Sequence, residues 1–315
     1  MSNNSVESSN RPILVTGAAG CIGSWVVAAL VRAGRPVVAF DLSGDRLRLL
    51  LTAEEADGVT WLTGDITDTA TVSGAVTRLD PRAVIHLAAL QIPFCLADPV
   101  AGARVNVVGQ MNVLEAVRHH GRCRLVYASS VAALPAAGGE GPVTLYGVYK
   151  LADEGAARIY WQDWSVPSIG LRPHTVYGPG RDQGLTSAPT RAILAAIAGK
   201  PFAIPFKGAL QFQYAAEMAD IFIRCADAEA EGAPVFDVGG RMVEVAEIIA
   251  AIGAAVPGAQ VTSDGEALPV RPDLDNTPLR DLVGDWDETP LDDGVRASAE
   301  AFRDLLARGL VEAEG

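Results

Sequence analysis

The sequence predicts an α/β fold built on a doubly wound parallel sheet. From Ile13 to about Arg172, short apolar runs rich in Val and Ile alternate with longer stretches of helical period, which is typical of repeated strand–helix–strand units. The runs are almost continuously apolar, as expected for strands that helices cover on both faces. A glycine-rich turn follows the first run directly. Together these observations favour a buried parallel sheet over a half-solvated antiparallel one.

The elements follow from the same periodicity. Six strands are expected in the first part of the chain, at 13–16, 37–41, 60–62, 84–87, 125–129 and 168–171. Helices are expected at 24–33, 104–119, 146–160, 192–198, 245–255 and 298–306, with a further buried strand at 235–238. The segment 269–290 is rich in Pro and Asp and predicts a loop with short turns.

The chain of 315 residues is long enough for a cofactor domain and a smaller second lobe. Residues 1–11 are rich in Ser and Asn and predict a disordered tail. Residues 12–177 are expected to form a Rossmann-type domain. The pattern breaks at Gly178-Pro179-Gly180, so residues 178–315 are expected to be mainly a substrate-binding lobe, with some elements returning to the first domain.

Composition excludes several classes of function. Hydrophobic residues make up 49% and the formal net charge is −13, which indicates a folded protein with an acidic surface. Such a surface repels nucleic acid and anionic lipid, so neither is expected as a partner. The beginning of the chain lacks the apolar run of a secretory signal, and we expect a cytoplasmic protein. Cys21, Cys95, Cys123 and Cys225 are widely separated, so we expect reduced cysteines and no metal site.

The glycine-rich turn Gly17-Ala18-Ala19-Gly20-Cys21-Ile22-Gly23 lies between a predicted strand and a predicted helix. A dinucleotide requires this arrangement, because glycines let backbone N–H groups approach the pyrophosphate at the positive end of a helix. Asp41 ends the second strand, where a carboxylate accepts ribose hydroxyls and repels a 2′-phosphate. NAD is therefore expected. Asp41 could instead begin a turn, and Arg46 leaves NADP open.

Tyr146 and Lys150 stand one helical turn apart on the same face. A tyrosine phenol has a pKa of about 10. A lysine ammonium beside it favours the phenolate, which can exchange a proton with an alcohol. Ser130 follows a predicted strand, at the sheet edge where open α/β sheets bind ligands. Ser130, Tyr146 and Lys150 are therefore the candidate catalytic residues.

These motifs resemble those of the extended short-chain dehydrogenases, the NAD-dependent epimerase/dehydratase family. The matching segments, in chain order, are TGAAGCIG at 16–23, Asp41, GDI at 64–66, HLAA at 86–89, Asn106 with Gly109 and Asn112, YASS at 127–130, YGVYK at 146–150, and LRP at 171–173 with VYGP at 176–179. The resemblance implies a Ser-Tyr-Lys triad and a larger set of NAD contacts. That set is Gly17, Gly20, Cys21, Ile22, Gly23, Asp41, Asp65, Ile66, Leu87, Ala88, Ala89, Asn106, Ser129, Tyr146, Lys150, Pro173 and Thr175.

Some of these residues have simpler interpretations. Asp65 could cap a following helix, and Asn106 could be a satisfied buried amide. The chain also departs from the family pattern. Thr175 stands where members that act on nucleotide sugars usually carry Asn, and Leu210 where they carry Arg. Val131-Ala132 replaces the acidic pair of members that eliminate water, so dehydration is not expected.

We therefore expect an NAD-dependent oxidoreductase that transfers a hydride at a secondary alcohol or ketone carbon of a sugar, sugar acid or similar polyol. Candidate substrate contacts are Gln91, Thr175, Arg181 and Arg271. One alternative is a UDP-sugar 4-epimerase with tightly bound NAD. Another is a noncatalytic NAD-sensing module. The helices expected at 104–119 and 146–160 resemble those that pair across a dimer in the family, and a homodimer is expected.

Overall fold

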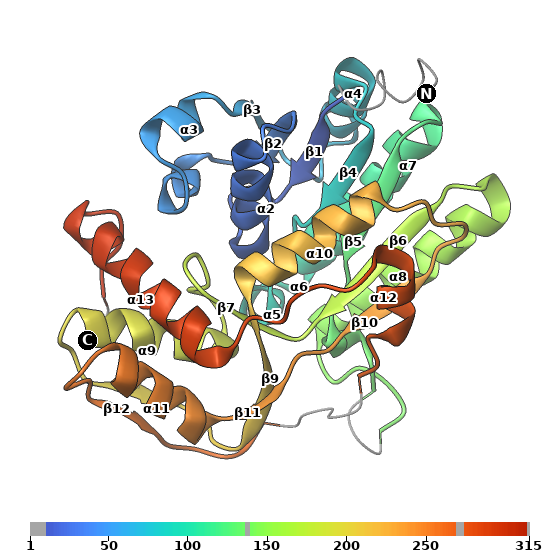
Figure 1. The fold of residues 1–315 in the computed structure, drawn as a ribbon. Coiled ribbons are helices and arrows are strands. Elements are labelled where there is room, and N and C mark those ends of the chain that lie inside the picture. The colour runs from blue at the N-terminus through green and yellow to red at the C-terminus, as the bar shows by residue number, and fades with distance from the viewer. Residues whose placement is uncertain (1–10, 136–138, 269–273, 314–315) are drawn as a thin grey trace.

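The computed structural model describes residues 11–135, 139–268 and 274–313. A seven-stranded sheet lies between two layers of helices, and a smaller lobe of short strands and helices stands below one end of that sheet (Figure 1). The large sheet contains β1 (Ile13–Thr16), β2 (Val37–Asp41), β3 (Thr60–Thr63), β4 (Ala83–His86), β5 (Arg124–Ala128), β6 (Ser168–Pro173) and β10 (Val235–Val238).

The strand order is β10-β6-β5-β4-β1-β2-β3, and all six neighbouring pairs run parallel. This is the doubly wound order, because the chain first builds outward from β1 to β3 and then returns to place β4 on the other side of β1. The predicted parallel sheet is confirmed, with strand ends shifted by one or two residues.

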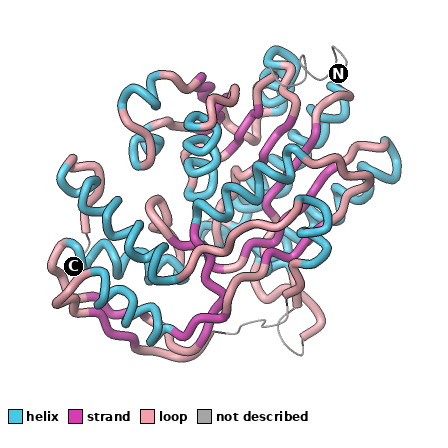
Figure 2. The backbone as a smooth tube through the Cα atoms, in the orientation of Figure 1, coloured by secondary structure: helices cyan, strands magenta, loops and turns pink. Residues whose placement is uncertain are grey.

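The helices of the first part of the chain are α2 (Cys21–Arg32), α3 (Ala53–Asp57), α4 (Thr69–Leu79), α5 (Ile92–Ala97), α6 (Pro99–Ala103), α7 (Gly109–His120) and α8 (Leu145–Trp164). The later ones are α9 (Ala188–Ile197), α10 (Ala215–Asp227), α11 (Val245–Ala255), α12 (Thr277–Val283) and α13 (Leu291–Ala307). Short turns η1 (Asp45–Leu49), η2 (Arg104–Val108), η3 (Val131–Ala133) and η4 (Leu185–Ser187) complete the pattern seen in Figure 2.

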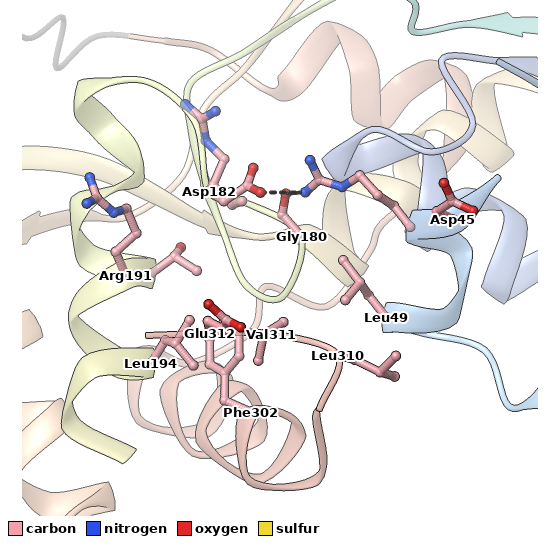
Figure 3. A pocket seen from close by; sticks show the side chains of 13 residues that line it. Asp45, Leu49, Gly180, Asp182, Arg191, Leu194, Phe302, Leu310, Val311 and Glu312 are labelled. Atoms are coloured by element: carbon pink, nitrogen blue, oxygen red, sulfur yellow. Dashed lines mark hydrogen bonds and ion pairs between the residues drawn. The ribbon is translucent and has the colours of Figure 1, made fainter. Parts of the chain in front are cut away.

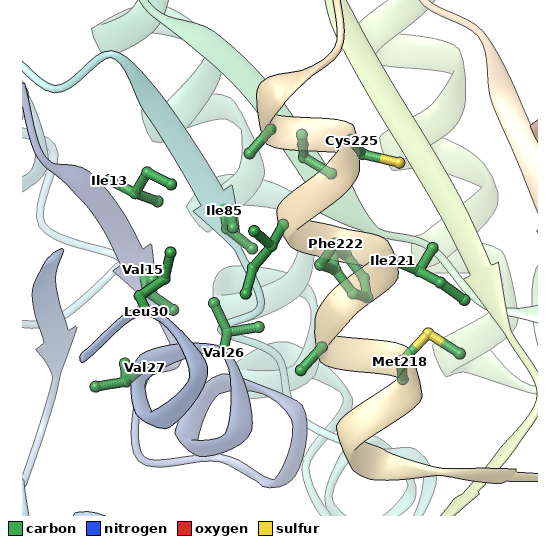
Figure 4. Packing of buried hydrophobic residues seen from close by; sticks show 14 of the residues in the cluster. Ile13, Val15, Val26, Val27, Leu30, Ile85, Met218, Ile221, Phe222 and Cys225 are labelled. Atoms are coloured by element: carbon green, nitrogen blue, oxygen red, sulfur yellow. The ribbon is translucent and has the colours of Figure 1, made fainter. Parts of the chain in front are cut away.

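Helices α2 and α10 pack together over one face of the sheet. Figure 4 shows Val26 of α2 on the side that faces Phe222 of α10, and Leu30 of α2 beside Val15 of β1, and these residues are all fully buried. The opposite face carries a second apolar cluster drawn from α4, α7 and α8. Because both faces are covered, the strands are apolar along most of their length.

The smaller lobe has its own apolar core. Its strands are β7 (Thr175–Tyr177), β8 (Phe202–Ile204), β9 (Ala209–Tyr214), β11 (Met242–Glu244) and β12 (Val261–Ser263), which form a sheet in the order β11-β9-β7 and a pair β12-β8. Tyr177 and Phe212 stack there with ring centroids 3.9 Å apart. Side chains of α9, α11 and α13 complete this core.

The structure corrects three expectations about the elements. The segment expected to be only loop contains α12. The single helix expected at 104–119 is divided into the π-helical turn η2 and the α-helix α7, and the last helix begins at Leu291 rather than 298. Across the described part of the chain, no helix combines the length and apolar character needed to span a bilayer.

Candidate active site

The carboxyl ends of β1 and β4 mark the point at which the sheet changes winding direction. Thr16 and His86 are register partners there, and Thr16 Oγ1 lies 2.6 Å from His86 Nδ1. In open α/β sheets the strands separate at this point and leave a crevice for a ligand. Burial, together with the positive charge of Lys150, lowers the pKa of His86 to about 3, so this imidazole is neutral at physiological pH.

The glycine turn lies in this crevice, and its first and last glycines have no room for a side chain. Gly17 has φ +69°, and a Cβ there would stand 2.5 Å from the backbone nitrogen of Ala88. A Cβ at Gly23 would stand 2.1 Å from the Gly17 carbonyl oxygen. The following helix α2 begins with Gly20 as its N-cap, with no side-chain cap and no acidic residue in its first turn. The backbone N–H groups at the start of α2 can therefore donate hydrogen bonds to an anion.

Asp41 closes the turn from the side of β2. Its carboxylate accepts hydrogen bonds from the backbone of Ala19 at 2.9 Å and of Leu42 at 2.7 Å. Arg46, which left room for NADP, donates to the Gly180 carbonyl at 3.0 Å and to Asp182 at 2.9 Å. Because the guanidinium of Arg46 is already paired, the surroundings of Asp41 favour a ribose diol over a 2′-phosphate.

Two residues expected at the cofactor make contacts with their own chain. Asp65 accepts from the backbone of Thr67, whereas α4 is capped by Asp68. Asn106 is 1% exposed, and its amide holds both the N–H and the carbonyl of Leu90. Asn106 therefore has the bonds of the satisfied buried amide considered above, and it fixes the segment that follows β4.

Tyr146 and Lys150 both belong to α8 and face each other. Lys150 is 2% exposed, and its Nζ lies over the Tyr146 ring at 5.9 Å from the centroid. Ser130 follows β5, and its hydroxyl oxygen accepts from the backbone of Ala132 at 3.1 Å. The start of α8 packs on this turn, since a Cβ at Gly147 would stand 2.1 Å from the Ala132 carbonyl oxygen. The fold thus brings the segments of the three candidate catalytic residues together.

Several buried charges lie behind this group and were not anticipated. Arg172 donates to both carboxylate oxygens of Glu154, at 2.7 and 2.6 Å, and also pairs with Asp237 at 3.1 Å. The hydroxyl of Ser129 donates to the same Glu154. Arg172 is therefore paired with carboxylates of the protein and is not a free cation for a substrate. Asp153, fully buried, stands 3.4 Å from Lys150.

The loop after β7 joins the two lobes at the same crevice. Trp25 of α2 donates to the Pro179 carbonyl at 3.0 Å, which fixes the loop on the first turns of α2. Arg181 donates to Gln91 at 2.8 Å and to Thr186 at 3.0 Å, so two of the predicted substrate contacts lie side by side. Burial raises the pKa of the Cys21 thiol to about 11, and the positive charges of Arg181 and Arg46 act in the opposite direction. Both guanidinium groups therefore lie near the glycine turn.

The remaining predicted substrate residues are Thr175 and Arg271. Thr175 is 5% exposed, and its backbone donates to His174 Nδ1 at 2.9 Å. Burial lowers the pKa of His174 to about 4. Leu210 is buried in the apolar core of the small lobe and offers no group to a phosphate. Arg271 lies outside the described residues.

A cavity of about 410 Å³ lies between the lobes, lined by residues of η1, the loop after β7, α9, α13 and the segment 310–312. Figure 3 shows Leu49, Leu194 and Phe302 around the cavity, with Asp182 above them. Asp182 accepts a hydrogen bond from Arg46 at 2.9 Å. Ser130, Tyr146 and Lys150 do not line it. At its edge Arg46 is paired with Asp182, and Arg181 bonds to Gln91 and Thr186, which do not line the cavity.

The buried acids of α8 left one signal in the sequence, their spacing from Lys150, and spacing does not reveal burial. Asp153 follows Lys150 by three residues and Glu154 follows it by four, so both share a helix face with it. The sequence around them resembles an ordinary solvated helix, however, and their burial depends on packing against β5 and β6. His174 gave no signal beyond its place next to Thr175.

The chain matches the profile of the NAD dependent epimerase/dehydratase family over residues 13–239. It is 32% identical to UDP-glucose 4-epimerase of Mycolicibacterium smegmatis over 311 aligned residues, covering 92% of this chain and 98% of the relative. Its fold is similar to that of UDP-glucose 4-epimerase of Thermus thermophilus in complex with NAD (TM-score 0.79, 24% identity, 93% and 99% of the two chains). It is also similar to a partial-consensus L-threonine 3-dehydrogenase (TM-score 0.77, 25% identity, 94% and 99%).

Proposed function

From the premise that this chain belongs to the NAD dependent epimerase/dehydratase family, we propose that it is an NAD-dependent oxidoreductase acting on a sugar, sugar acid or similar polyol. Its reaction centre is a secondary alcohol or ketone carbon. One observation carries the proposal: the buried ammonium of Lys150 lies over the ring of Tyr146, at the crevice marked by His86. A phenol beside an ammonium is a group suited to proton exchange with an alcohol.

The residues of the crevice fit a dinucleotide. Gly17 and Gly23 leave only backbone at the start of α2, where the pyrophosphate would lie. Asp41 would hold the adenosine ribose, and Asp65 and Ile66 would flank the adenine. The backbone of residues 87–89, with Pro173 and Thr175, would line the nicotinamide half. Asn106 would act indirectly by holding Leu90 in place.

Each triad residue has a distinct task in this proposal. Tyr146 exchanges a proton with the substrate oxygen, and Ser130 donates a hydrogen bond to the same oxygen. Lys150 favours the phenolate of Tyr146 and holds the nicotinamide ribose. When bound, NAD supplies the acceptor for the hydride that leaves the carbon. The turn that follows Ser130 packs closely on α8 at Gly147. This contact fixes the position of the Ser130 segment relative to the Tyr146 segment.

The substrate side supports a small polyol. The two positions that would grasp a nucleotide diphosphate hold Thr175 and the core residue Leu210, and Arg172 is consumed by Glu154 and Asp237. Removing an arginine fork from a phosphate site forfeits about 1.5 to 3 kcal/mol. Arg181, next to Gln91, is the described cation best placed to hold a carboxylate or hydroxyl of the substrate.

A UDP-sugar 4-epimerase remains the second candidate, because the Mycolicibacterium relative is a UDP-glucose 4-epimerase that aligns over nearly the whole chain. The test is a two-arm assay on the purified protein. One arm follows nicotinamide absorbance with added NAD and a panel of sugars, sugar acids and polyols. The other follows UDP-glucose and UDP-galactose interconversion without added NAD. Activity confined to the second arm would replace the oxidoreductase proposal with the epimerase.

We also propose that the protein is a homodimer. Helix α8 exposes Leu145, Val148 and Leu151 at three-residue intervals, each more than 40% exposed, and Val108 of η2 adds to this surface. Apolar side chains gathered in this way are typical of a covered face. Sedimentation equilibrium at micromolar concentration tests this, and a mass of one chain would contradict it.

A further inference from the structure

Asp153 is a carboxylate buried directly beside Lys150 on α8. It is fully buried, and its Oδ2 lies 3.4 Å from Lys150 Nζ, which is itself 2% exposed. Its other oxygen, Oδ1, has no hydrogen-bond partner within the described part of the chain. Acidic side chains are seldom fully buried without a partner, and here the partner is the lysine of the proposed triad.

The surroundings leave Asp153 as the acid paired with Lys150. Glu154, its neighbour in sequence, is engaged with Arg172 and Ser129. The elements packed against α8 offer no other acid to Lys150 among the described residues. Turn η3 and helix α6 bear no ionisable side chain, and Arg104 of η2 is exposed. Glu115 of α7 contacts Tyr160, which lies about two helical turns further along α8. The other ionisable groups whose charges interact with this pair are His86 of β4, Cys95 of α5, Tyr127 of β5 and the neighbouring Glu154 of α8.

We propose that Asp153 is a positioning residue of the active site, which holds the ammonium of Lys150 toward the Tyr146 ring and the nicotinamide ribose. The inference rests on the role given to Lys150 in the proposed function. Without a charged Asp153, the long lysine side chain loses the ion pair that restricts its rotamers, and its contact with the dinucleotide weakens.

The charge of this carboxylate changes near neutral pH. Burial raises the pKa of Asp153 to about 7, against the opposing effect of Lys150 and with a further rise from Glu154. Below that pH the ion pair is lost and Lys150 is released. The structure thus couples the hold on NAD to pH through one buried residue.

The experiment measures NAD affinity, which needs no substrate. The full chain is freed of co-purified dinucleotide and titrated with NAD by calorimetry on either side of about pH 7. We expect the parent to bind NAD about tenfold more weakly at about pH 6 than at about pH 8, as expected for loss of one charge-assisted contact. Asp153→Asn should bind at the weak level at both values. The four histidines of the chain are present in every variant, so they contribute equally to each comparison.

Asp163→Asn is the matched control, since it removes an exposed carboxylate from the same helix, and it should keep the pH step. If Asp153→Asn does not fold, Asp153→Leu fills the same space without a charge. A pH step that survives in the Asp153 variant, or a parent with no step, overturns the role of Asp153 alone. Unchanged NAD binding in Lys150→Met would instead overturn the role given to Lys150 in the proposed function.

Discussion

Gly17 and Ala88 are in backbone contact across the crevice between β1 and β4, so closely that a Cβ on Gly17 would stand 2.5 Å from the Ala88 nitrogen. The turn that would bind pyrophosphate and the segment that would line the nicotinamide half are therefore held against each other before any ligand arrives. The geometry of the cofactor site depends on this contact.

Gly17→Ala is therefore expected to abolish NAD binding. The new methyl group must displace backbone, and φ +69° is a conformation that alanine rarely adopts. Calorimetry with NAD measures the loss. Gly74→Ala is the control, because Gly74 lies in α4 with open space around it, and the change should add about 0.5 to 1 kcal/mol of stability without altering NAD affinity.

Asp41 and Arg46 together should set the preference between NAD and NADP. Asp41→Ser is expected to weaken NAD binding about tenfold through loss of the ribose hydrogen bonds, without a matching gain for NADP. Arg46 stays paired with Asp182 in that variant. Adding Asp182→Asn should release the guanidinium and raise NADP affinity. Titration of both dinucleotides against the single and double variants decides this, and strong NADP binding by Asp41→Ser alone would contradict it.

The buried pair of Glu154 and Arg172 should be essential for stability. Glu154→Gln leaves Arg172 its pair with Asp237 but removes the bidentate carboxylate, and we expect a loss of about 1.5 to 3 kcal/mol in the free energy of unfolding. Denaturant titration measures it. Asp220→Asn removes the partner of Arg224 in a more exposed pair, and its cost should stay below about 1 kcal/mol. Equal losses for the two variants would count against a special role for the buried pair.

His86 should make the fold sensitive to acid. Its pKa is about 3 in the folded chain and near 6.5 when unfolded, so the unfolded state binds a proton first and stability falls as pH drops below about 6.5. The cost reaches about 2 kcal/mol at about pH 5. His86→Asn should lack this part of the slope, whereas the exposed His119→Asn should retain it. Unfolding curves at several pH values test the difference.

The sequence predicted the parts of the fold that repeat. Buried strands appear in the sequence as apolar runs, so the sheet could be anticipated. The candidate site could be anticipated too, because the spacing of the glycines and of Tyr146 and Lys150 is itself the signal. Helix α10 could not be anticipated, because it packs against α2, with Phe222 facing Val26, and these residues lie almost 200 positions apart in the chain. Asp153 was missed for the same reason, since a charged residue on a helix resembles a solvated one until a second element covers it.

In the proposed function Tyr146 exchanges the proton at the substrate oxygen, and the decisive measurement is the turnover of Tyr146→Phe on the best alcohol of the substrate panel. We expect a fall in kcat of at least about a hundredfold with NAD affinity retained. Tyr149→Phe, which removes only a hydroxyl bonded to the Pro99 carbonyl, should stay near the parent rate. A Tyr146→Phe protein that turns over within about twofold of the parent would contradict the account.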